Sequence, residues 1–375
     1  MSTDVTLESL IGGHHDVLAE LRATSPIAWV PAVDGWVVTT RELAGTVMRD
    51  AVTYTVDDPR FSTAQVVGPS MLSLDGEAHA RHRDPFAAAY RPAVVMARYA
   101  DTIVTTARDL VAGIAGDRRA ELRRQLAGPL AVAAVALSLG LEDIATNDLL
   151  GWYDRIVAAV ENVSVGLPID PSAAEAFAHL SDALASAVTR PDSVLHEAAA
   201  QMSQQEMVSN AAVFLFGGIE TSEGMTANLL AHLLDNPDQL AAVRADRSLV
   251  DAAVEESLRL EPAAARVDRY ATRDVEVAGQ HVRSGDLVIV SLAAANRDPA
   301  VYAMPDRFDL SRANARTHLA FAHGPHACIG AQLARMETRA ALIAVLDLLP
   351  GIELAEPVEV QGLVFRKPQA VHARW

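Results

Sequence analysis

The chain has 375 residues, half of them hydrophobic, and a formal net charge of −17. So strong a negative charge argues against a protein that wraps nucleic acid, because such proteins carry clustered positive charge. No stretch reaches the roughly 18 apolar residues of a membrane span, and the start lacks a signal-peptide pattern. We therefore expect a cytoplasmic protein without membrane contact. The single cysteine, Cys328, excludes an internal disulfide and a multi-cysteine metal site.

The expected elements form one continuous globular unit, residues 1–375, because no linker, repeat or low-complexity tract divides the chain. In chain order they are a strand-rich part at about 26–40, a helical core at about 41–260, a mixed part of strands and irregular loops at about 261–330, and a C-terminal helix with short strands at 331–375. In the first part, strands at 27–30 and 36–39 flank a turn that ends at Gly35. The pattern predicts a mainly α fold with small β-sheets.

The longest expected helix begins at a capping box formed by Ser203 and Glu206. No proline follows until Pro237, which leaves room for a helix of about 30 residues, or about 45 Å at the α-helical rise. Its residues are apolar around most of the circumference, so we expect it to be buried and to cross the molecule.

Four residues in the middle of this helix do not suit an ordinary buried helix. Gly217 and Gly218 each cost about 1 kcal/mol relative to alanine in a helix interior. Either another helix packs closely there, or some other group approaches the backbone. Glu220 and Thr221 place an acid and a hydroxyl in the same apolar helix, and buried carboxylates are rare unless they are paired or functional.

The single cysteine lies in the segment FAHGPHACIG, residues 321–330, just before an expected helix. Gly324 and Gly330 flank it and permit tight turns and the close approach of a flat ligand. A helix N-terminus lowers the pKa of a nearby thiol, and the resulting thiolate suits metal ligation. The alternative is that Cys328 is a small buried hydrophobic residue.

The spacing of Phe321, Gly324, Cys328 and Gly330 resembles the haem-binding loop of the cytochrome P450 family. The resemblance runs from about residue 26 to the end of the chain, although Ala322 replaces a frequent glycine of that loop. It implies a P450 fold, one haem b (iron protoporphyrin IX) per chain and Cys328 as the proximal iron ligand. Phe321 and the two glycines would contact the haem.

Four basic residues at three separate places in the chain match the family's haem-propionate positions. An arginine donates two parallel hydrogen bonds to a carboxylate, which suits this task. Each of them taken singly would more often be a solvated surface charge. The resemblance assigns to the propionates His79, Arg83, Arg269 and His326.

An acid–arginine pair, Glu256 and Arg259, resembles the family's Glu-x-x-Arg motif. Residues three apart share a helix face and can form an ion pair, although a surface pair of this kind would be worth little. The resemblance implies that Arg307 completes a structural triad with them.

The segment 217–222 resembles the part of the family's long helix that lies over the haem. Gly217 and Gly218 would then leave a gap for dioxygen at the iron. Glu220 would relay protons from solvent, and Thr221 would position a water or a proton for the bound oxygen. This acid–alcohol pair favours dioxygen with two electrons over peroxide as the oxidant.

Positions that face the substrate pocket in the family are mostly apolar here, which predicts a mainly apolar substrate. By this comparison they are Val213, Phe216, Ala265, Arg266, Val267 and Phe365. Arg266 is the exception, and it could bind a substrate carboxylate if it points inward.

The expected function is that of a bacterial haem-thiolate monooxygenase that acts on a small or medium organic molecule, in secondary metabolism or in catabolism. The chain has no Gly-x-Gly-x-x-Gly motif, so we expect electrons from a separate ferredoxin or flavodoxin with its reductase. Such carriers are acidic, and a local basic patch is required, for which Arg81, Arg335 and Arg339 are candidates. We expect a monomer.

Two alternatives stay open. The same fold could carry out oxidative coupling, desaturation, nitration or peroxide-driven oxidation instead of hydroxylation. A haem-thiolate sensor or binding protein without turnover belongs to a different class, and the presence of Glu220 and Thr221 argues against it.

Overall fold

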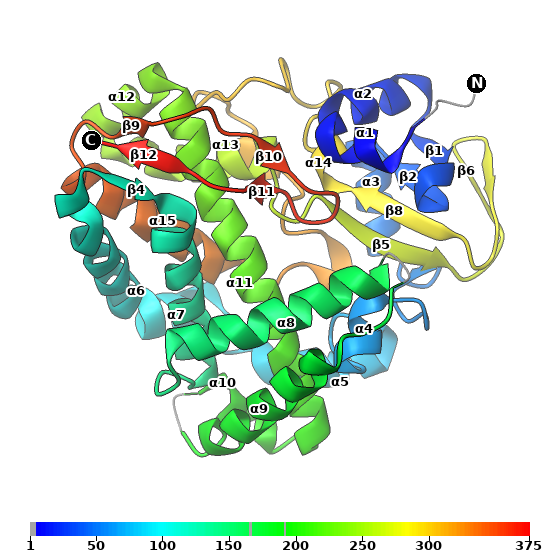
Figure 1. Cartoon of the computed structure of the whole chain (residues 1–375). Coiled ribbons are helices and arrows are strands. Elements are labelled where there is room, and N and C mark those ends of the chain that lie inside the picture. The colour runs from blue at the N-terminus through cyan, green and yellow to red at the C-terminus, as the bar shows by residue number, and fades with distance from the viewer. Residues whose placement is uncertain (1–4, 165–166, 191–192) are drawn as a thin grey trace.

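The computed structural model describes residues 5–164, 167–190 and 193–375. Helices dominate this part of the chain, and its strands gather in small sheets (Figure 1). The predicted mainly α fold with small β-sheets is therefore confirmed. Among the described residues, no helix is both long enough and apolar enough to cross a lipid bilayer.

The α-helices are α1 (Leu7–Gly12), α2 (His14–Thr24), α3 (Arg41–Arg49), α4 (Ser62–Val67), α5 (Gly76–Ala87), α6 (Pro92–Ile114), α7 (Gly128–Leu139), α8 (Thr146–Ser164), α9 (Pro171–Ala187), α10 (Val194–Ala199), α11 (Gln204–Asp235), α12 (Pro237–Ala245), α13 (Val250–Leu260), α14 (Leu292–Ala295) and α15 (Ala331–Leu348). The strands are β1 (Ile27–Val30), β2 (Gly35–Val38), β3 (Tyr54–Thr55), β4 (Arg119–Glu121), β5 (Arg266–Ala271), β6 (Val275–Val277), β7 (Gln280–Val282), β8 (Leu287–Ser291), β9 (Glu353–Leu354), β10 (Val360–Gln361), β11 (Lys367–Pro368) and β12 (His372–Arg374).

The helix α11 runs through the middle of the helical part, and α7, α13 and α15 pack against it (Figure 1). Most of its residues are buried, as its apolar circumference predicts. Apolar side chains of these helices and of α6 form the largest hydrophobic cluster. Because packing on nearly all sides holds α11 in place, its side chains occupy fixed positions in the interior.

Both ends of α11 agree with the sequence prediction. The Ser203 hydroxyl accepts a hydrogen bond from the backbone N–H of Glu206 at 3.4 Å, and the Glu206 carboxylate accepts one from the N–H of Ser203 at 2.9 Å. This is the predicted capping box. The helix ends at Asp235, and Pro237 begins α12.

The largest sheet has the strand order β1-β2-β8-β5-β3, in which β2 and β8 are parallel and the other neighbours antiparallel. The predicted strand 27–30 is β1. The second strand, β2, begins and ends one residue earlier than predicted, because Asp34 has a φ of +45° and closes the turn before Gly35. One face of the sheet packs with α3, and the other lies under α1 and α2.

A hairpin near the C-terminus, formed by β10 and β11 and called here the strap (residues 360–368), lies beside α11. Gly362 has a φ of +118°, and a side chain there would overlap the carbonyl oxygen of Phe365, so the tight turn requires glycine. The backbone of the strap also accepts a hydrogen bond, since the N–H of Ala265 donates to the carbonyl of Val364 at 2.8 Å. The strap is thereby held between α11 and the segment that enters β5.

Candidate functional site

The loop that holds Cys328 is a tightly turned segment in front of α15. Its backbone folds back on itself, because the N–H of Cys328 donates to the carbonyl of Phe321 at 2.8 Å. Ala322 and Gly324 both have left-handed φ values, +56° and +76°. A Cβ at Gly324 would lie 3.0 Å from the Cα of Arg49 in α3, so this glycine permits a close approach of backbone to backbone. The Gly324 position therefore has a packing reason independent of any ligand.

The electrostatics of Cys328 differ from the prediction. Cys328 lies three residues before α15 with its side chain accessible, but its place deep in the fold removes bulk water from the thiol, and this burial raises the pKa of the thiol. Backbone N–H groups of Gly330 and Ala331, with the charges of Arg83 and Arg335, act in the lowering direction but do not outweigh burial. The N–H groups before and in α15 do lower the pKa of the Cys328 thiol, as predicted, but by less than burial raises it.

The four residues assigned to the propionates lie together, although they come from three separate parts of the chain. The rings of His79 and His326 lie 4.3 Å apart between centroids. Arg83 donates to the carbonyl of Ala327, next to the cysteine, at 2.6 Å. Burial lowers the pKa of Arg269, and the charge of the nearby Asp75 carboxylate offsets part of that shift.

Asp75 is a member of this group that the sequence reasoning missed. It lies just before α5, and it accepts hydrogen bonds from Thr55 at 2.6 Å and from His326 at 2.8 Å. Burial alone would raise its pKa, but these bonds lower the pKa of Asp75 to about 2. The signal that could have found it is its place one turn before His79 in the same segment.

These residues fit a haem with two carboxylates. His79 is buried, its Nε2 has no hydrogen-bond partner in the described structure, and burial lowers its pKa to about 4. An unpaired buried nitrogen near Arg83 and His326 is a suitable donor site for a carboxylate. The accessible sulfur of Cys328 supplies a ligand for iron beside them. Phe321, in the same loop, stacks under the guanidinium of Arg335 at 4.4 Å.

The two predicted glycines of α11 have different surroundings. A Cβ at Gly217 would meet no atom within 4 Å, so the helix is open there. A Cβ at Gly218 would lie 2.5 Å from a methyl group of Val135 in α7. Close helix packing explains Gly218, which corrects its assignment to the haem gap, and only Gly217 is placed to leave a gap.

The acid and the alcohol of α11 bind different partners. The Thr221 hydroxyl donates to the carbonyl of Gly217 at 2.5 Å. The buried Glu220 accepts a hydrogen bond from the hydroxyl of Tyr153 in α8, and its other oxygen lies 2.8 Å from Lys367 Nζ in the strap. Sequence reasoning missed Tyr153 and Lys367, although Lys367 stands out as the one lysine of the chain.

Three of the predicted pocket residues lie close together. The rings of Phe216 in α11 and Phe365 in the strap pack edge to face, 5.4 Å apart between centroids. Val213 lies one turn of helix before Phe216 and is half-buried. The fourth, Ala265, is fully buried but belongs to another apolar cluster, with Ile289 and Leu363, while Phe365 pairs with the neighbouring Ala264. Val213, Phe216 and Phe365 form an apolar wall between α11 and the strap.

Arg266 lies on the opposite face of β5 from Arg269, the propionate-assigned residue of that strand. Side chains alternate between the two faces of a strand, so Val267 and Arg269 share one face while Arg266 and Asp268 share the other. The guanidinium of Arg266 lies 3.3 Å from the Asp268 carboxylate, which confirms that these two side chains point the same way. The suggestion that Arg266 points inward to bind a substrate carboxylate is therefore wrong. Val267 packs with the apolar cluster on the α3 side of the sheet.

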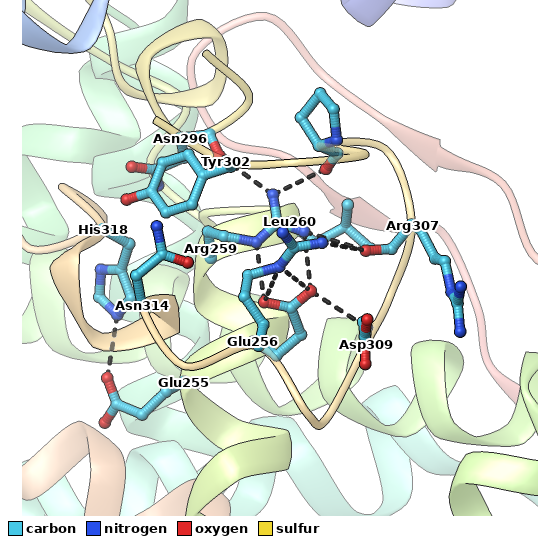
Figure 2. Close-up of polar contacts among 12 residues, drawn as sticks. Glu255, Glu256, Arg259, Leu260, Asn296, Tyr302, Arg307, Asp309, Asn314 and His318 are labelled. Carbon is cyan, nitrogen blue, oxygen red and sulfur yellow. Dashed lines mark hydrogen bonds and ion pairs between the residues drawn. The ribbon is translucent and has the colours of Figure 1, made fainter. Parts of the chain in front are cut away.

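The Glu256–Arg259 pair is fully buried, so the surface-pair alternative is wrong (Figure 2). Two nitrogens of Arg259 lie 2.8 and 2.9 Å from the two oxygens of Glu256. The third member is Arg312, whose Nε lies 2.9 Å from Glu256. Arg307 contributes its backbone carbonyl, 3.2 Å from Arg259, and its exposed side chain extends away (Figure 2). This corrects the expected triad.

The three arginines proposed as a basic patch are each paired with a carboxylate. Arg81 pairs with Glu206, and Arg339 with Asp251. Arg335 lies 2.6 Å from Glu255, which is buried. The pairs neutralise these cations, so they do not form the expected patch of free positive charge.

Comparison with known proteins gives the family. A model of the family described as Cytochrome P450 matches residues 178–349. The chain is 32% identical to the Vitamin D3 dihydroxylase of Streptomyces griseolus, covering 92% of this chain and 88% of that protein. It is also 32% identical to the cytochrome P450 monooxygenase PikC of Streptomyces venezuelae, with 95% and 90% covered.

Solved structures agree over nearly the whole length. The crystal structure of CalO2 has a TM-score of 0.88 at 28% identity, covering 96% of each chain. That of P450BioI, in complex with an acyl carrier protein ligated to hexadec-9Z-enoic acid, has a TM-score of 0.86 at 26% identity, covering 96% of this chain and 98% of the other. The chain belongs to the cytochrome P450 family of bacterial monooxygenases, whose members bind haem b through a cysteine ligand.

Proposed function

We propose that this P450 inserts one oxygen atom of O2 into a mainly apolar small or medium organic substrate, with electrons from a separate ferredoxin-type partner. For a hydroxylation the balance is substrate C–H, O2, two electrons and two protons, which give C–OH and water. The haem, when bound, supplies the oxygen activation. The observation that carries the proposal is the accessible Cys328 beside the group of His79, Arg83, Arg269 and His326.

The apolar wall supports the proposed substrate class. Phe216 and Phe365 meet edge to face, and Val213 packs in the same apolar cluster. Pockets lined in this way bind ligands mainly through apolar contact. Because Arg266 is paired on the other face of β5, no arginine among the predicted pocket residues recognises a carboxylate. We therefore expect neutral apolar compounds to bind better than acidic ones.

The protein's own part in the reaction would be to supply protons at the opening of α11. Thr221 holds its hydroxyl on the Gly217 carbonyl, where the helix is open, and it can exchange that bond for one to a water. Glu220 is the neighbouring acid and would pass protons on through water once its present partners release it. This arrangement supports dioxygen as the oxidant rather than peroxide.

The first test is a titration of the purified ferric holoprotein with a panel of neutral apolar, aromatic and acidic compounds, followed by the Soret band. We expect low-spin to high-spin conversion with neutral apolar compounds, because such a compound displaces the water on the iron. Conversion by acidic compounds alone would contradict the substrate class. No conversion by any compound would contradict a free small-molecule substrate and would favour one that is presented on a carrier, as in the P450BioI complex.

A further inference from the structure

The strap and α11 meet in two adjacent contacts, one aromatic and one ionic. Phe216 and Glu220 lie four residues apart and so share a face of α11. Phe365 and Lys367 lie two residues apart in extended backbone and so share a side of the strap. Phe365 packs on Phe216, and Lys367 pairs with Glu220, so the two contacts run in the same order along both segments.

Arg366, between the two, points the other way and fixes the strap. Its Nε lies 2.8 Å from the carboxylate of Glu261 at the end of α13, and both side chains are buried. This ion pair holds the middle of the strand, while the side chains before and after it contact α11. Phe365 and Lys367 are therefore the two immediate chain neighbours of an anchored residue, and both contact α11.

The ionic contact leaves Lys367 shared between two buried carboxylates. Its Nζ lies 2.8 Å from Glu220 and 2.5 Å from Glu223, and 14% of the lysine side chain is exposed. Glu223 has a second cation, since Arg123 Nε lies 3.4 Å away. Glu220 has only the Tyr153 hydroxyl besides the lysine among its described partners. Moving the lysine would thus free Glu220 far more than Glu223.

We propose that Lys367 is a positioning residue that holds the Glu220 carboxylate on the strap side, and that a ligand which displaces Phe365 releases it. The ammonium then stays with Glu223, and Glu220 can turn toward water and Thr221. Substrate occupancy would in this way set when protons are delivered. The inference rests on the proposed function, because the release of Glu220 matters only where that acid supplies protons.

The chain's one lysine makes the contact observable at a single atom. The holoprotein is labelled with 15N-lysine, and the Nζ signal is recorded with imidazole or with 4-phenylimidazole bound to the ferric haem. Both ligands give a low-spin iron, and they differ in the phenyl ring. We expect 4-phenylimidazole to shift the Lys367 signal and to speed its proton exchange with water, whereas imidazole leaves it as in the free protein. In Phe365→Ala the two ligands should give the same signal.

The result that overturns the proposal is a Lys367 signal that is identical with both ligands while the Soret band shows both to be bound. A ligand-dependent shift that persists in Phe365→Ala would also overturn it, because the strap would then not be the link. The measurement needs no turnover. A coupled lysine in a protein without oxygenase activity would refute the proposed function alone, and an uncoupled lysine in an active enzyme would refute this inference alone.

Discussion

Two buried glutamates of this molecule differ in how completely their charge is compensated. Glu256 is fully buried, with Arg259, Arg312 and the N–H of Asp309 as partners. Glu220 is almost as deeply buried, but its partners are one shared lysine and a tyrosine hydroxyl from a different helix. Glu256 therefore joins a closed network that can only hold the fold together. Glu220 lies in an open one, because its lysine is shared with Glu223 and its tyrosine comes from α8.

A substitution in the closed network around Glu256 should cause the largest loss of stability. Arg259→Ala leaves the Glu256 carboxylate with one guanidinium fewer at a site without solvent, and we expect a loss of about 3–5 kcal/mol in the free energy of unfolding. Denaturant unfolding followed by circular dichroism measures it. The matched control is Arg307→Ala, which removes an exposed side chain and keeps the carbonyl, and should cost about 0.5 kcal/mol or less. Equal losses in the two variants would restore the triad that includes the Arg307 side chain.

A substitution in the open network around Glu220 should reduce the free energy of unfolding by less. Lys367→Met removes the ammonium, but Arg123 remains near Glu223 and Tyr153 remains on Glu220, so we expect a loss of about 1–3 kcal/mol. The same denaturation measurement applies, with Lys367→Arg as the charge-conserving control. A loss as large as that of Arg259→Ala would show that the Glu220 site is as closed as the Glu256 site, contrary to the comparison.

A third buried glutamate, Glu337 in α15, extends the comparison to a carboxyl without a cation. Burial raises its pKa well above the ordinary value, and its Oε2 has no partner among the described residues. A folded-state pKa above the unfolded value means that the folded protein binds more protons, so stability falls as the pH rises above about 4.5. Glu337→Gln should remove that decline and raise stability at neutral pH, by about 1 kcal/mol. Unfolding measured from pH 5 to pH 8 decides it, and an unchanged slope would refute a neutral Glu337.

The smallest effect should come from an exposed pair of the same chemistry. Arg339 and Asp251 are about half exposed, and a surface ion pair of this kind contributes about 0–1 kcal/mol. Arg339→Ala should therefore change the free energy of unfolding by about 0.5 kcal/mol or less at moderate salt. Thermal unfolding at low and high salt measures it. A large loss that salt does not reduce would mean that Arg339 packs structurally.

Features encoded by nearby residues could be predicted from the sequence. The capping box of Ser203 and Glu206, the turn before Gly35 and the loop around Cys328 depend on residues within a few positions of one another. The basic residues of the propionate group were found because they match three separate motifs of a known family. The fold followed from the same motifs and from the helical periodicity.

Features that depend on distant contacts could not be predicted. Tyr153, Glu220 and Lys367 come from three segments far apart in sequence, and no spacing joins them. Arg312 and Arg307 lie in the same short irregular segment, where spacing does not say which side chain turns inward. The pKa of Cys328 depends on the balance between helix N–H groups and burial, and burial is set by the whole fold.

The central claim, a monooxygenase driven by dioxygen and a separate electron carrier, is tested most directly by turnover under 18O2. The substrate is the compound that converts the spin state most completely, and a ferredoxin with its reductase supplies electrons. We predict a product that carries one 18O atom, formed only with the reducing system and not with peroxide alone. A product without 18O, or one formed equally well from unlabelled peroxide, would contradict the claim.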